Sequence, residues 1–340
     1  MTATISAHRR ALSPCGRESL DLMAQWKASP LRTPLGGWPR LFWGADEVEP
    51  LRARAAGDFP ERMRRRAEAI LDDPAVFASE PAWQAAHAGA IMDLATAAWI
   101  TGEERLASMA SRLMDRAASA ESWSADRRTP PQCDRVAAMT AATLVRAMDV
   151  LAGRLTDNHV RRYRDAVREK CLDPFLRAAA ASSPPWPGDV VSVAMCGDVG
   201  LAALGTADGE GGLEDILAPA LETVACTLYG SLGGDDDPHA LADALGAGMR
   251  LFVALERIWP AAHSFAGHPG LGHAADRLLQ LAASGPVTWS ADESATMLLL
   301  ARYQSLRWYG GSRRDALFAA ARAGQIESLV QIAWDVADSA

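Results

Sequence analysis

Apolar residues recur at helical spacing along most of the chain, from about residue 45 onward. One such face comprises Ile91, Leu94, Ala95 and Ala98, which follow one another at the intervals of the buried side of an amphipathic helix. The only strand-like run is residues 190–193, and it directly precedes another helical pattern. The pattern therefore predicts an all-α fold.

Short connectors separate the predicted helices. Residues 101–103, 153–157 and 209–212 contain glycine and polar side chains and are only a few residues long. Connections of this length favour antiparallel neighbours, so the chain is predicted to consist of helical hairpins. The expected elements are a first helix near 46–71, hairpins near 81–122, 134–181, 190–229, 238–284 and 291–323, and a last helix near 326–337.

The predicted hairpins can each bury one face on a neighbour, either in an open superhelix or in a closed ring. Irregular loops at 122–133 and 182–190 favour the ring, an incomplete α/α toroid of antiparallel helical hairpins whose loops surround a central cleft. No stretch is long enough to be a domain linker. Residues 38–340 are therefore expected to form a single toroid domain after an N-terminal extension at 1–37.

Charge and composition exclude several classes of function. The chain has 34 basic and 42 acidic residues and a formal net charge of −8, which argues against nucleic acid and anionic membranes as partners. The only two lysines, Lys27 and Lys170, have no supporting motif, so Schiff-base chemistry is not expected and no cofactor is predicted. No long apolar segment and no export signal is apparent, so the protein is expected to be cytoplasmic.

Cysteine and histidine spacing does not predict a metal site. The five cysteines are widely spaced and include no CxxC pair, so buried thiols are expected. These cysteines are Cys15, Cys133, Cys171, Cys196 and Cys226. His263, His268 and His273 recur every five residues, whereas ligands on one helical face need spacings of three or four.

Four stretches carry short motifs beyond the apolar spacing: Trp38–Phe42 with residues 47–54, residues 98–105 with their Thr-Gly-Glu-Glu-Arg turn, residues 147–156, and residues 195–204. Together they resemble the helical domain of heparinase II/III and oligoalginate-lyase type proteins. The resemblance implies an α/α toroid and an enzyme that acts by β-elimination on uronic-acid polysaccharides or oligosaccharides.

The chain departs from that family at positions that carry its chemistry. The resemblance implies polar asparagine before the run at 196–204, whereas residues 190–193 of this chain are apolar except for Ser192. Ser192 is a substrate-binding candidate. Leu241 stands where the resemblance implies a catalytic tyrosine, and the β-sandwich that follows the helical domain in such lyases is not apparent. These departures favour a different substrate, or a partner protein that completes the cleft.

The densest polar cluster comprises Asp235, Asp236, Asp237 and His239 at a loop-to-helix junction. Adjacent carboxylates repel one another, so one of them can act as a general acid or base, with His239 as a second proton carrier. Asp237 and His239 are predicted to be catalytic, and Asp235 and Asp236 to bind an amine. Alternatively, Asp237 before Pro238 is simply the start of a helix.

Asp198 lies within an apolar helical run between Gly197 and Gly200, where a ligand or another helix can approach closely. It is predicted to be a third catalytic residue, and a paired structural carboxylate is the alternative. Asp134 is a further substrate-binding candidate, although its position directly before a helix also fits a cap.

Three larger side chains complete the set of substrate-binding candidates. Trp186 lies in a proline-rich loop that can form a wall of the cleft, Tyr229 ends a helix shortly before the acidic cluster, and His87 lies near the start of another helix. Packing in the core is the alternative for Tyr229 and His87.

These observations lead to three functional hypotheses. The first is an intracellular lyase-like enzyme of secondary metabolism, which promotes elimination or intramolecular amine cyclisation on a small polar, amine-bearing substrate. The second is β-elimination on a uronic-acid oligosaccharide. The third is a non-catalytic binding or scaffold subunit that requires a partner chain.

Overall fold

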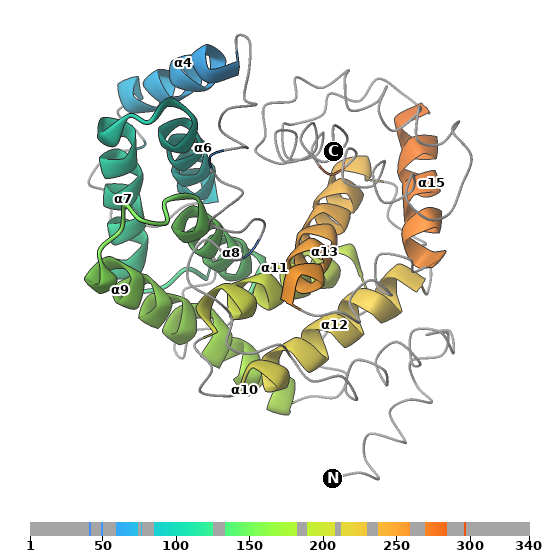
Figure 1. Cartoon of the computed structure of the whole chain (residues 1–340). Coiled ribbons are helices and arrows are strands. Elements are labelled where there is room, and N and C mark those ends of the chain that lie inside the picture. The colour runs from blue at the N-terminus through green and yellow to red at the C-terminus, as the bar shows by residue number, and fades with distance from the viewer. Residues whose placement is uncertain are drawn as a thin grey trace. The chain divides into compact units, whose positions relative to one another are not determined.

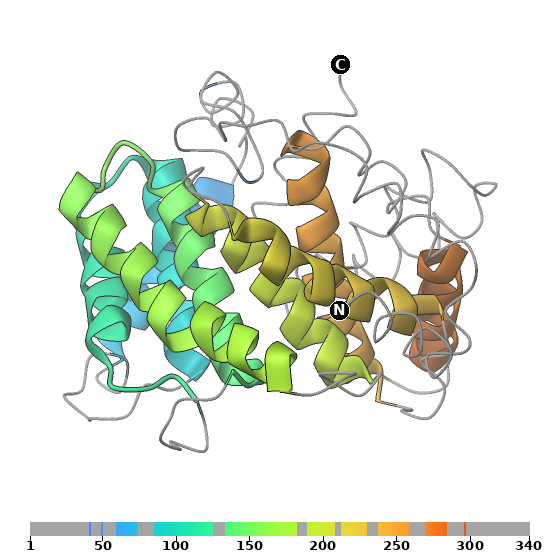
Figure 2. The same cartoon turned by 90° about the horizontal axis from the view of Figure 1, so that it is seen from below.

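The computed structural model describes residues 41, 49, 59–73, 76, 85–124, 133–181, 189–207, 212–229, 237–258, 269–283 and 296 (Figure 1, Figure 2). Every regular element in these ranges is a helix, which confirms the all-α prediction. The toroid and the single domain at 38–340 stay predictions. None of the helices described is both long enough and apolar enough to cross a bilayer.

The helices match the predicted positions. They are α4 (Phe59–Asp72), α6 (Ala85–Thr101), α7 (Glu104–Ser119), α8 (Arg135–Val150), α9 (Asp157–Val167), the π-helix η1 (Arg168–Leu172), α10 (Asp173–Ala181), α11 (Val190–Thr206), α12 (Leu213–Tyr229), α13 (Pro238–Ile258) and α15 (Pro269–Ala283). The predicted elements near 291–323 and 326–337 lie outside the described residues.

Contacts within the chain define two compact units. One, here called the α6–α9 unit, comprises the described residues within 33–177 and 201–213. The other, the α12–α15 unit, comprises the described residues within 178–200 and 214–331. The chain passes from one unit to the other within α10 and again within α11.

Helix α6 lies at the centre of the α6–α9 unit. It packs against α4, α7 and α8 (Figure 1), and all its residues from Leu94 to Ile100 are buried. Contact on three sides explains why α6 is apolar nearly all round, whereas α7 has one buried face. Gly102, with φ of +77°, makes the tight turn that joins α6 to α7, so this predicted hairpin is confirmed.

A single π-helical turn interrupts the helical segment that follows α8. Residues Arg168–Leu172 form η1 between α9 and α10, and no loop separates the three (Figure 2). Both α9 and η1 pack against α8, and α9 also packs against α7. The predicted hairpin at 134–181 is therefore formed, and its second arm contains this π-helical turn.

Close helix packing characterises the α12–α15 unit. Helix α13 packs against α15, and it also meets α11 at Gly197. A Cβ at Gly197 would lie 2.6 Å from the carbonyl carbon of Ala247 and 2.8 Å from the amide nitrogen of Gly248. The backbones of α11 and α13 are thus in direct contact, which only glycine at position 197 permits.

Candidate functional site

Asp237 marks the start of α13. Its side chain is exposed, and its Oδ1 accepts a hydrogen bond of 2.9 Å from the backbone N–H of His239. Its carbonyl oxygen accepts the first helical hydrogen bond, from the N–H of Leu241. Pro238 follows as the first helical residue, a position where its missing N–H costs nothing. In this structure Asp237 is a helix cap, the alternative that the sequence left open.

The described neighbours of Asp237 on α13 differ in their exposure to solvent. His239 is exposed in the first turn of α13, whereas Leu241, at the position implied for a catalytic tyrosine, is buried. Asp235 and Asp236 lie outside the described residues.

Asp198 is in a different environment, on α11 in the part that belongs to the α12–α15 unit. It is 1% exposed, and its Oδ1 lies 3.5 Å from Nη2 of Arg250 on α13. The Arg250 side chain is 12% exposed, and its Nε has no hydrogen-bond partner in the described part of the chain. An acid and a base are therefore buried together here, with one guanidinium nitrogen unused.

Small residues allow this ion pair to form in the core. A Cβ at Gly246 would lie only 3.1 Å from Nη1 of Arg250 and would clash with Oγ1 of Thr296, which is itself 1% exposed. Asp198, Arg250 and Thr296 thus converge around a stretch of α13 that has no side chain at position 246. We call these three residues the buried polar cluster.

The two acidic positions predicted to act together are well separated. Because Gly197 meets α13 at Ala247, ten residues after Asp237, the contact lies about 15 Å along the helix from Asp237. The structure therefore brings Asp198 to Arg250 and does not bring it to the cap at Asp237.

The remaining candidates have local structural roles where they are described. Asp134 is the N-cap of α8, because its Oδ1 accepts from the N–H of Ala137 at 2.9 Å and its Oδ2 from the Ser124 hydroxyl at 2.8 Å. Ser192 is buried in the first turn of α11, where its N–H donates to Asp189. His87 is buried on α6.

Some of the residues considered in the sequence fall outside the described ranges or on exposed surface. Trp186, His263 and His268 lie outside the described residues, and Tyr229 ends α12 with a side chain that is not described. His273 is exposed on α15. Within the described ranges, no three side chains among histidine, cysteine, aspartate and glutamate are grouped closely enough to hold a metal ion.

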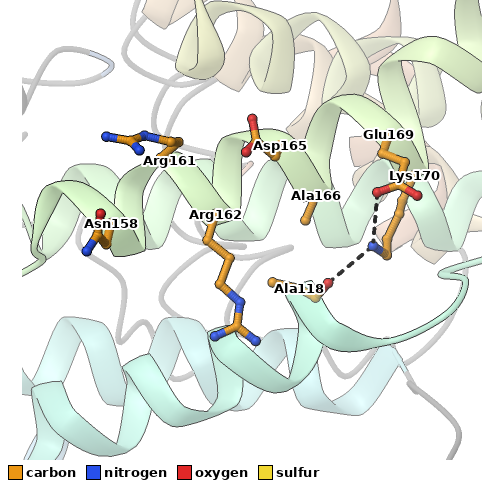
Figure 3. A pocket seen from close by; sticks show the side chains of 8 residues that line it. All are labelled: Ala118, Asn158, Arg161, Arg162, Asp165, Ala166, Glu169 and Lys170. Atoms are coloured by element: carbon orange, nitrogen blue, oxygen red, sulfur yellow. Dashed lines mark hydrogen bonds and ion pairs between the residues drawn. The ribbon is translucent and has the colours of Figure 1, made fainter.

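A groove of about 330 Å³ lies in the α6–α9 unit, beside η1 (Figure 3). Its wall is formed by Ala118, Asn158, Arg161, Arg162, Asp165, Ala166, Glu169 and Lys170. Lys170 is 8% exposed, and its Nζ donates to the carbonyl oxygen of Ala118 at 3.2 Å. Its ammonium also lies 6.0 Å from the ring centroid of Trp123. The end of α7 and an aromatic face thus stabilise a buried cation.

Lys170 is a residue that sequence reasoning set aside. Its isolation as one of two lysines was visible, but its burial depends on η1, which apolar periodicity does not reveal. Nearby, the hydroxyl of Tyr163 contacts Oγ of Ser111 at 3.0 Å and donates to Oδ1 of Asp115 at 3.2 Å. Burial raises the pKa of Tyr163 to about 12, so it is not a base at neutral pH.

No protein-family model matches the chain, and no curated protein matches it significantly. The resemblance to heparinase II/III type proteins therefore rests on the short stretches described above, and the buried polar cluster must be interpreted from its own chemistry.

Proposed function

We propose that this chain is an enzyme of small-molecule metabolism on a lyase-like helical scaffold, with Asp198 as its proton-transfer group. The observation that carries the proposal is the buried ion pair between Asp198 and Arg250. The proposed reaction is elimination or ring closure by an amine, on a small polar substrate that carries an amine.

The energetics of the pair support a functional role. Burying two charges costs several kcal/mol per ion, and well-packed apolar residues often serve stability as well or better. The contact between Oδ1 of Asp198 and Nη2 of Arg250 is long, at 3.5 Å, so it compensates only weakly for that cost. Ionisable groups held in such surroundings are typical of sites that bind or transform a ligand.

The chemistry of the cluster fits the proposed reaction. A carboxylate in low-dielectric surroundings can accept a proton from carbon or from an attacking amine, and it attracts a cationic substrate. Arg250 can hold an anionic or carbonyl group of the same molecule through its remaining N–H groups. Proton transfer is assigned to Asp198 rather than Asp237, because Asp237 is exposed and its oxygens bind the first turn of α13.

A charge-neutral double variant tests the proposal. Asp198→Asn alone leaves the Arg250 charge buried, so a loss of activity could reflect unfolding. The double variant Asp198→Asn with Arg250→Met removes both charges and should therefore stay folded. The control is Asp243→Asn, which changes an exposed acid on α13. We would incubate wild type, the two Asp198 variants and this control with amine-bearing metabolites and uronic-acid oligosaccharides. Mass spectrometry follows the products.

We expect turnover by wild type and Asp243→Asn, and none by the folded double variant. Full activity in the double variant would contradict the role of Asp198. A wild-type chain that turns over no compound of the panel and purifies with a stoichiometric partner would instead support a scaffold subunit.

Arg250 favours a second candidate function, β-elimination on uronic-acid oligosaccharides. A guanidinium beside the base neutralises a uronate carboxylate and thereby acidifies the adjacent carbon. Near-ultraviolet absorbance of an unsaturated product from uronate oligomers, but not from amine-bearing compounds, would select this candidate over the first.

A further inference from the structure

Two thiols meet in the α6–α9 unit. Sγ of Cys133 lies 3.9 Å from Sγ of Cys171, although the residues are 38 positions apart in the sequence. Cys133 directly precedes Asp134, the N-cap of α8, and Cys171 belongs to η1. The start of α8 and the π-helical turn are thus joined by a sulfur–sulfur contact.

The two thiols differ in access to solvent. Cys171 is fully buried, whereas Cys133 is partly exposed. A co-reactant can therefore reach Cys133 but not Cys171. This is the arrangement of an attacking thiol with a resolving thiol behind it.

We propose that Cys133 and Cys171 form a reversible disulfide by exchange with a small-molecule disulfide. The Cys133 thiolate attacks one sulfur of the small disulfide, which breaks that S–S bond and releases one small thiol. The Cys171 thiolate then attacks Sγ of Cys133 and releases the second small thiol. The protein loses two electrons and two protons, and the small disulfide is reduced to two thiols.

The geometry permits this bond with little rearrangement. A disulfide has an S–S distance of about 2.05 Å, so the sulfur atoms need to approach by about 2 Å, which side-chain rotation and a small backbone shift supply. The π-helical turn is suited to such a shift, since its hydrogen bonds are already displaced from the α-helical pattern.

The bond would act on the groove beside η1. Lys170 precedes Cys171 in the same turn and forms part of the groove wall. Fixing Cys171 to the start of α8 therefore fixes the segment that carries Lys170. The redox state of the thiol pair thus becomes a control on the shape of that groove.

The test uses the full chain equilibrated in reduced or oxidised glutathione, followed by alkylation and peptide mass spectrometry. In oxidised glutathione we expect the alkylated cysteines to fall from five to three, with one cross-linked peptide pair containing Cys133 and Cys171. Dithiothreitol should restore all five. The bond closes a long loop, so oxidation should also raise the Tm by about 5 °C.

Matched variants separate this pair from the other thiols. Cys133→Ser should abolish both the cross-link and the Tm shift, and Cys196→Ser, at a buried thiol on α11, should retain both. Cys133→Ser is the decisive variant because its site is partly exposed and tolerates the change. Five alkylated cysteines in oxidised glutathione, a stable mixed disulfide on Cys133, or a cross-link to another cysteine would overturn the proposal.

Discussion

The start and the middle of α13 show two ways in which a protein uses an aspartate. At the start, Asp237 is exposed and its side chain accepts a hydrogen bond from one backbone N–H, and it belongs to the most acidic stretch of the sequence. In the middle, α13 presents Arg250 to Asp198, a single acid within an apolar run of α11. The number of acidic residues in a segment is thus a poor guide to chemistry, and the surroundings of each carboxylate are a better one.

The largest difference in the free energy of unfolding should appear between neutralising the buried Asp198 and neutralising an exposed aspartate of α13. Asp198→Asn leaves Arg250 buried without its anion, so we expect the free energy of unfolding to fall by about 3 kcal/mol. Asp243→Asn, on the exposed side of α13, should change it by less than about 0.5 kcal/mol. Urea denaturation measures both, and equal effects would remove the contrast between buried and exposed acids.

A smaller effect is expected from the backbone contact that positions Asp198. Gly197→Ala places a methyl group against the backbone of Ala247, so we expect a loss of about 2 kcal/mol as α11 and α13 separate. The control is Gly89→Ala on α6, where a Cβ meets nothing within 4 Å. That change should stabilise the protein by about 0.5 to 1 kcal/mol. Stabilisation by both variants would contradict the close approach.

The cap at Asp237 should contribute less than the buried pair. Asp237→Ala removes one N-terminal hydrogen bond, for an expected loss of about 0.5 to 1 kcal/mol. Asp134→Ala removes two bonds at the start of α8 and should cost about 1 to 2 kcal/mol. Thermal denaturation ranks the two, and a loss at Asp237 as large as at Asp198 would show that Asp237 is more than a cap.

Tyr163 extends the comparison to a buried group that is neutral. Its pKa of about 12 in the folded chain exceeds the value of 10 for an unperturbed tyrosine, so folding favours the protonated hydroxyl. This contribution is complete below pH 10 and is lost as the pH rises from about 10 to 12. Tyr163→Phe should flatten the decline of stability in that interval. A titration curve of the phenolate absorbance that is identical in both proteins would refute the assignment.

Much of the helical organisation follows from local pattern. The positions of α6, α7, α8 and α11 were predicted because their apolar spacing and glycine-containing connectors are visible within short windows. The π-helical turn at 168–172 was not predicted, since it leaves no periodic signal of its own. Local pattern therefore predicts helices and turns but not their irregularities.

The candidate site depended on contacts between distant parts of the chain. Asp198 was identified because an acid in an apolar run needs a partner, but its partner Arg250 lies 52 residues later. Which residue of α13 faces Asp198 is set by the contact of Gly197 with Ala247 and Gly248, which no local spacing encodes. Likewise, Lys170 was set aside because its contacts with Ala118 and Trp123 come from tertiary structure.

The π-helical turn also has a consequence for how this chain tolerates insertions and deletions. A π turn holds one more residue than the α-helical turn it replaces, so residues on either side of 168–172 follow two different helical phases. Removing a single residue there would let α9 and α10 merge into one regular helix whose side chains keep their present facing, whereas the same deletion elsewhere in α9 or α10 would rotate every later side chain by about 100°. A one-residue gap at this position of an alignment would therefore preserve the facing of α10, and a gap a few residues away would not.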